Sequence, residues 1–135
     1  RADCEQRAAA KGLADRVRFV GFHRDPSSLY AAADVAVHAS SSEALSNFLI
    51  EAQAHGLPAV AYQAQGIEEC FVPGQTGWGI RRDDRAAFRT ALLRLLADRS
   101  ARAAAARSFA RATFDPSRQV TAYLDLFQRL LRAAP

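Results

Sequence analysis

Two glutamates stand on either side of the point where a polar loop runs into a helix. Glu43 belongs to the serine-rich loop that follows an apolar strand, and Glu51 lies inside a helical segment that begins near Ser46. A carboxylate accepts two hydrogen bonds and therefore suits a vicinal diol, such as that of a ribose or a hexose. Glu51 should lie about 7 to 8 Å from the start of the helix, measured along its axis, whereas Glu43 stands before that start. That separation fits the two ends of a sugar nucleotide.

The start of this helix is suited to the diphosphate between those two ends. Ligands of open α/β sheets gather at the carboxyl ends of the strands, where helix N-termini offer unpaired amides and a positive dipole end. The hydroxyls of Ser40–Ser42 could donate to the same phosphate, or could only form a turn and a cap. Without further context, two glutamates at this spacing are more often an ordinary loop carboxylate and an ordinary helix-surface residue.

The elements around this loop alternate between strands and helices. Short runs rich in β-branched or aromatic residues predict strands at residues 17–22, 34–39 and 58–62. Helices are predicted at residues 3–14, 27–33 and 46–54. Ser27 is the expected cap of the second helix, while Gly12 and Gly56 end the first and the third. Strands that are apolar on both faces indicate a Rossmann-like parallel sheet with flanking helices, an α/β fold.

Three longer helices follow a short helical turn at 67–72 and a small apolar strand at 78–80. Asp83 or Asp84 should cap the first of these helices. The second is predicted over 101–114, and Pro116 begins the third. The apolar stripe of this last helix, which we interpret as a packing face, consists of Val120, Tyr123, Leu124, Phe127, Leu130 and Leu131.

The order of these blocks resembles the C-terminal, donor-binding domain of retaining GT-B glycosyltransferases of family 4, also called glycosyl transferases group 1. The hallmark of that family is Glu, seven residues, Glu, here Glu43 and Glu51. The other matching blocks, in chain order, are VRFVGF, LYAAADVAVHAS, EAQAHGLPAVAY and GIEECFVPGQTGW. A Glu pair alone is weak, whereas the pair with these blocks around it is a strong match over nearly the whole chain.

The resemblance implies a nucleotide-sugar site. Glu51 would bind the ribose hydroxyls, and Glu43 would contact and orient the donor hexose as the catalytic residue. His23 would flank the base. Further donor contacts in the loop and the first helical turn are implied for Ser42, Leu45, Ser46 and Asn47. The donor would be a UDP-, GDP- or similar nucleotide sugar. Its hexose would be transferred with retention at the anomeric carbon and without a metal or other cofactor. The absence of an Asp-x-Asp motif agrees with this mechanism.

The chain departs from the family pattern at two places. Gly usually follows the first Glu, whereas this chain has Ala44, which restricts the backbone if a positive φ is needed. The family's diphosphate-binding Arg and Lys, on the first strand and its turn, would precede Arg1. We therefore expect an N-terminally truncated, incomplete C-terminal half of a GT-B fold. Without the first two strands of the doubly wound order, residues 17–22 would be separated from the strands that begin at Asp34 and Pro58.

This organisation divides the chain into a partial nucleotide-sugar-binding domain, residues 1–115, and a C-terminal helix, residues 116–135, that packs on that domain or crosses from it. The missing N-terminal acceptor domain would be the partner, so the chain alone should bind donor weakly and should not catalyse transfer. We expect a bacterial, cytoplasmic protein. Its parent could make peripheral contact with the inner face of the membrane.

Composition limits the remaining classes. The 135 residues are 50% apolar and 24% charged, which is typical of a folded domain, and no apolar run is long enough to span a membrane. The charge of +4 comes from 18 basic and 14 acidic residues. Because the arginines share helices with acidic residues and lack interleaved aromatics, we predict no nucleic-acid partner. Cys4 and Cys70 have no metal or redox spacing and are expected to be reduced structural thiols.

Other chemical residues are interpreted conservatively. His38 and His55 are isolated, and His38 faces the expected ligand only through its position at a strand end. One of Glu68 and Glu69 could help to select the hexose, although exposed loop carboxylates are commoner. Two alternatives to a transferase remain open: a non-catalytic nucleotide-sugar-binding module, favoured only by Ala44, and a membrane-surface adaptor that uses its arginine-bearing helices.

Overall fold

A three-stranded parallel sheet forms the centre of the computed structural model, which describes residues 1–133. Its strands are β1 (Ala36–His38), β2 (Ala59–Tyr62) and β3 (Gly77–Ile80), in the spatial order β1-β2-β3. The helices are α1 (Ala2–Ala10), α2 (Ser27–Ala32), α3 (Asn47–Ala54), α4 (Arg85–Ala97), α5 (Arg99–Phe114) and α6 (Pro116–Ala133). Two 3₁₀ turns, η1 (Ala14–Arg16) and η2 (Glu68–Cys70), complete the order. The predicted α/β class is confirmed.

The two faces of β2 belong to different halves of the core. Ala59 and Ala61 point into the cluster that contains Leu49 of α3, whereas Val60 points into the cluster with Leu95 of α4. All these side chains are fully buried. Because neighbouring residues of a strand face opposite sides, a short apolar strand buried on both faces must be covered by helices on both. This arrangement fixes α3 beside the carboxyl ends of the strands.

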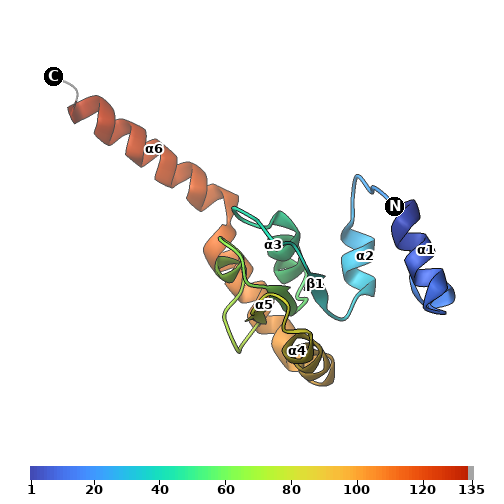
Figure 1. The fold of residues 1–135 in the computed structure, drawn as a ribbon. Helices are drawn as coiled ribbons and strands as arrows, with labels where there is room; N and C mark the ends of the chain where they lie inside the picture. The colour runs from blue at the N-terminus through green and yellow to red at the C-terminus, as the bar shows by residue number, and fades with distance from the viewer. Residues whose placement is uncertain (134–135) are drawn as a thin grey trace.

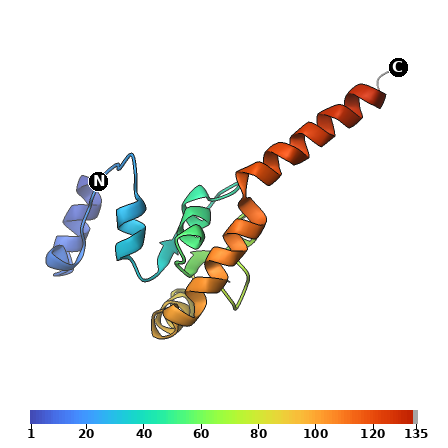
Figure 2. The ribbon, with the colours of Figure 1, turned by 180° about the vertical axis from the view of Figure 1, so that it is seen from behind.

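Helix α6 leaves the body of the molecule. It follows α5 after Asp115 and projects away from the sheet in both views (Figures 1 and 2). None of its residues is buried, and the apolar stripe named above is 53% to 77% exposed. The stripe expected as a packing face therefore has no partner among residues 1–133.

The predicted strand at residues 17–22 is wrong. This segment has no regular secondary structure, lies between η1 and α2, and leaves Phe22 94% exposed. A strand requires a backbone partner, and β1 pairs only with β2. As the doubly wound order implied, the segment stays separate from β1. Its β-branched and aromatic residues therefore have no neighbouring strand with which to form backbone hydrogen bonds.

Helix boundaries otherwise follow the capping residues closely. Asp84, one of the two expected caps of α4, accepts a hydrogen bond from the Ala87 amide at 2.9 Å. Ser27 does not cap α2, because the Asp25 carboxylate accepts the Ser27 amide at 2.9 Å instead. Asp was the better acceptor at this turn, since it stands two residues before the first orphan amide.

Candidate functional site

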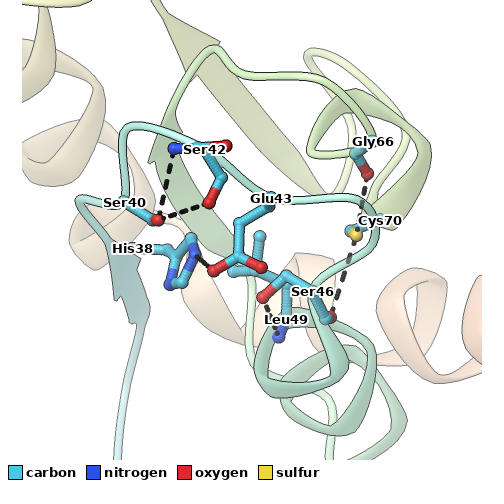
Figure 3. Close-up of polar contacts among 8 residues, drawn as sticks. All are labelled: His38, Ser40, Ser42, Glu43, Ser46, Leu49, Gly66 and Cys70. Carbon is cyan, nitrogen blue, oxygen red and sulfur yellow. Dashed lines mark hydrogen bonds and ion pairs between the residues drawn. The ribbon is translucent and has the colours of Figure 1, made fainter.

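Glu43 meets a histidine at the carboxyl end of β1. Nε2 of His38 lies 3.1 Å from Oε1 of Glu43, and both side chains are largely shielded from solvent (Figure 3). Because an ionised carboxylate only accepts, the Nε2 hydrogen of His38 must be the donor. One oxygen of Glu43 is thus held by the strand, and the other carries no bond within residues 1–133.

A serine turn carries the chain from β1 to Glu43. The Ser40 hydroxyl donates to the Ser42 carbonyl at 3.0 Å and accepts the Ser42 amide at 3.5 Å (Figure 3). Ser40 therefore shapes the loop, which matches the turn interpretation of the serine run. The side chain of Ser42 is exposed.

The N-terminus of α3 is ordered by its own cap. Ser46 is 3% exposed, and its hydroxyl accepts the Leu49 amide at 3.4 Å (Figure 3). Leu45 and Asn47 flank this cap and are exposed. The first-turn amides of a helix have no acceptor inside it, so this turn offers donors to an anion, as the sequence indicated.

Glu51 meets a tyrosine from α2. The Tyr30 hydroxyl donates to Oε2 of Glu51 at 2.9 Å, and the Tyr30 ring stacks on His55 with centroids 4.9 Å apart. Burial, together with the hydrogen bond and the charge of Glu51, raises the pKa of Tyr30 to about 12. Tyr30 thus stays protonated and remains a donor at neutral pH.

The loop after β2 supports the loop that carries Glu43. Gly66 has φ +74°, and its backbone packs directly against the Ala44 carbonyl. The Cys70 thiol lies between the two loops, 3.3 Å from the Gly66 carbonyl and 3.8 Å from the Ser46 carbonyl (Figure 3). Burial raises the pKa of this thiol, which therefore serves as a packing group.

The remaining expected site residues are more dispersed. His23 is exposed, and its ring bonds the Val20 carbonyl at 3.1 Å in its own turn, with no contact to Glu43 or Glu51 within residues 1–133. Glu68 accepts from the Gln63 amide group at 2.8 Å. His55 lies at the C-terminal cap of α3, as expected, and its ring also stacks on that of Tyr30.

Ala44 fits its position without strain. Among residues 1–133 only Asp83 is a non-glycine residue with positive φ, so Ala44 does not need the glycine that the family usually has there. The cost foreseen for this departure from the family pattern is absent. Sequence reasoning missed the role of Tyr30, although its aromatic hydroxyl in the LYAAAD block was a visible hydrogen-bond donor.

The charge around the site is one-sided. No Lys or Arg occurs between Arg24 and Arg81, while Glu43 and Glu51 both lie in that segment. A cavity of about 550 Å³ beside the loop is lined by Leu45, Asn47, Ile50, Thr113, Phe114, Arg118, Gln119 and Ala122. Arg118 thus brings a cationic side chain to the exposed side of α3. Within the described chain, no three His, Cys, Asp or Glu residues converge as metal ligands.

A model of the family described as "Glycosyl transferases group 1" matches residues 1–98. The lipopolysaccharide core biosynthesis mannosyltransferase LpsB of Rhizobium meliloti is 33% identical over 135 residues, covering 96% of this chain and 38% of its own. The D-inositol 3-phosphate glycosyltransferase of Salinispora tropica is 36% identical over 124 residues, covering 89% and 26%. The Vi polysaccharide biosynthesis protein VipC/TviE of Salmonella typhi is 38% identical over 78 residues, covering 58% and 14%.

Solved structures agree with these sequence matches. Sucrose-phosphate synthase from Thermosynechococcus elongatus superposes with a TM-score of 0.85 at 28% identity, over 98% of this chain and 35% of its own. Anabaena HepE, solved in complex with UDP, gives 0.77 at 27% identity, over 92% and 36%. The chain therefore has the fold of part of a GT-B glycosyltransferase, and it spans less than two fifths of each protein named here. Within residues 1–133, no helix combines the length and hydropathy of a membrane span.

Proposed function

The chain belongs to the glycosyl transferases group 1 family, and from this premise we propose that it is the donor-binding part of a retaining glycosyltransferase. The enzyme would transfer a hexose from a nucleotide-diphosphate sugar to a glycan, lipid or small-molecule acceptor. The observation that carries the proposal is the pair Glu43 and Glu51, each held by one hydrogen bond on either side of the α3 N-terminus.

Glu51 is assigned to the ribose. Tyr30 occupies Oε2, so Oε1 and the second lone pair of Oε2 remain for the two ribose hydroxyls. The side chain is exposed although its partner is buried, which leaves it accessible to a ligand. The similar structure of Anabaena HepE was solved in complex with UDP, which supports a uridine nucleotide as a ligand of this fold.

Glu43 is assigned to the hexose, as the residue that accepts hydroxyl hydrogens and orients the sugar for transfer. Its carboxylate stands before the helix, while Glu51 lies eight positions later in the chain. A sugar anchored by Glu43 and a ribose anchored by Glu51 would leave the diphosphate at the first turn of α3. Backbone amides around Leu45, Ser46 and Asn47, with the Ser42 hydroxyl, would receive it.

The negative charge of the diphosphate requires cations from outside this segment. Since no Lys or Arg lies between Arg24 and Arg81, the helix dipole and amides are the contribution of this segment, and Arg118, which lines the same cavity as Asn47, is a cation from outside it. The further positive charge is proposed to come from the rest of the parent protein. We propose no metal, and we place His23 beside the base.

Helix α6 is proposed to cross from the donor domain, residues 1–115, toward the acceptor domain. Its exposed apolar stripe and its projection from the body support this role. The stripe would then pack on the rest of the parent protein, whose named relatives are much longer than this chain.

The test is a calorimetric titration of the intact parent protein with UDP- and GDP-sugars, before and after Glu51→Ala. We expect the variant to lose at least tenfold in affinity for the sugar nucleotide that the protein accepts, because two hydrogen bonds to a charged group are removed. Glu5→Ala, which removes an exposed carboxylate of α1, is the control and should bind like wild type. Unchanged affinity in Glu51→Ala would contradict the ribose assignment.

A transfer assay then separates an enzyme from a binding module. Glu43→Gln should reduce turnover far more than donor affinity if Glu43 stabilises the transition state. A parent protein that binds donor tightly but transfers nothing to any acceptor would instead be a binding module. The strain-free backbone of Ala44 removes the one residue that favoured that alternative.

A further inference from the structure

We propose that Tyr30 and His38 are positioning residues for the two glutamates, and that Phe48 joins them into one aromatic brace. This inference rests on the proposed donor site. Within that site, it assigns Tyr30 to the ribose end and His38 to the hexose end.

Tyr30 fixes Glu51 from a different helix. Its hydroxyl lies 2.9 Å from Oε2 of Glu51, although 21 positions separate the two residues in the chain. The Tyr30 ring is 9% exposed and stacked on His55, so its hydroxyl has little freedom to move. Glu51 therefore has one oxygen in a fixed position before any ligand arrives, which reduces the entropy lost when a diol binds.

His38 fixes Glu43 in the same way from the end of β1. Nε2 lies 3.1 Å from Oε1 of Glu43, and the side chains are 17% and 30% exposed. The backbone of His38 pairs with Ala61 in the sheet. A loop carboxylate is thereby tied to a hydrogen-bonded strand of the sheet.

Phe48 lies between the two donors. Its ring centroid is 5.7 Å from that of His38 and 6.2 Å from that of Tyr30. Such spacings are typical of packed aromatic pairs. Since Phe48 belongs to the first turns of α3, the brace also ties both glutamate partners to the helix terminus where the diphosphate is proposed to bind.

The brace explains a charge arrangement that would otherwise repel the ligand. Two carboxylates beside a diphosphate are unfavourable unless each is directed at hydroxyls. With one oxygen of each glutamate held by a hydrogen bond from Tyr30 or His38, the remaining acceptor positions are left for ligand hydroxyls. The two anchored carboxylates are thus compatible with the proposed ligand, which has hydroxyls at each end and a diphosphate between them.

The experiment compares UDP with UDP-glucose, and GDP with GDP-mannose, on the intact parent protein, using calorimetry. Tyr30→Phe should weaken the binding of the nucleoside diphosphate and of the nucleotide sugar by the same factor, about three- to tenfold, because both ligands contain the ribose. His38→Leu should weaken only the nucleotide sugar by a similar factor, since the hexose is absent from UDP and GDP. His38→Gln keeps an N–H donor and should restore most of the lost affinity.

Tyr62→Phe is the matched control. Tyr62 packs on Phe88 with centroids 4.7 Å apart, and its hydroxyl forms no hydrogen bond within residues 1–133. This variant should bind both ligands like wild type. Phe48→Leu removes the central ring and should loosen both glutamates. It should therefore weaken the binding of the nucleoside diphosphate, and weaken the binding of the nucleotide sugar more.

The outcomes separate the brace from the donor site itself. If Glu51→Ala loses donor binding while Tyr30→Phe keeps wild-type affinity, the site stands and the brace is wrong. If His38→Leu weakens UDP as much as UDP-glucose, or Gln fails to restore binding, His38 is only a packing residue and the inference is overturned. If Glu51→Ala binds normally, the proposed function itself fails, whatever Tyr30→Phe does.

Discussion

The backbone of Gly66 lies against the carbonyl of Ala44 so closely that a Cβ built on Gly66 would be 1.6 Å from the Ala44 oxygen. The loop after β2 thus packs directly against the loop that carries Glu43. Backbone rather than a side chain makes this contact, so no side chain can rotate aside to make room for a larger residue. The position of Glu43 therefore depends on a residue 23 positions away from it in the chain.

Gly66→Ala is expected to displace the Glu43 loop and to lower nucleotide-sugar affinity at least tenfold in the intact protein. The added methyl group meets the Ala44 backbone, and Ala also resists the left-handed φ of +74° at a cost of about 1 kcal/mol. Gly74→Ala is the matched control, because Gly74 has φ +77° with nothing within 4 Å of the added atom. Calorimetry should find normal donor binding in Gly74→Ala, and equal losses in both variants would contradict the contact.

Ser46→Ala should lower the free energy of unfolding by about 1 kcal/mol, because the α3 cap loses its acceptor for the Leu49 amide. Asp84→Ala removes the comparable cap of α4 and should cost a similar amount. Only the first change should also weaken donor binding, since the diphosphate is proposed to bind at the first turn of α3. Denaturant unfolding and calorimetry on both variants check this, and equal donor affinity would separate the α3 terminus from the ligand.

Tyr30 should give a contribution to stability that disappears in alkali. Its pKa rises from 10 in the unfolded chain to about 12 in the folded protein. A raised folded pKa means that the stabilisation is fully present below pH 10 and is lost as the pH rises toward 12. We expect Tyr30→Phe to destabilise by about 1 kcal/mol at pH 8 and by progressively less above pH 10. A difference that stays constant to pH 12 in urea unfolding would exclude the Tyr30–Glu51 bond as its source.

The placement of Glu43 in a loop and of Glu51 in a helix could be predicted from the sequence, because both depend on local signals. The cap at Ser46 and the stop at Gly56 are equally local signals. Tyr30, by contrast, reaches Glu51 only through the packing of α2 beside α3, which no spacing rule encodes. The Gly66 contact with Ala44 likewise joins two loops that follow different strands and meet through the tertiary fold.

Residues 17–22 show the opposite failure. Their alternation of valine and phenylalanine is typical of a strand, and local propensity gave no reason to doubt it. A strand forms only where its backbone can pair with a neighbouring strand. Within residues 1–133, β1 pairs with β2, and residues 17–22 are not part of the sheet. Without a neighbouring strand, the apolar side chain of Phe22 remains exposed.

The two cysteines should differ sharply in reactivity. Cys4 is exposed on α1, contrary to the expected structural role, whereas Cys70 is fully buried between the Gly66 loop and Ser46. Since thiolates are the reactive species, the raised pKa of Cys70 and its burial should both slow alkylation. Iodoacetamide at pH 8 followed by peptide mass spectrometry should label Cys4 first and Cys70 only after denaturation. Gly66→Ala should speed the labelling of Cys70 by opening the loop above it, while Gly74→Ala should not. Equal labelling of both thiols in the native wild-type protein would show that the loops around Cys70 are not packed as described.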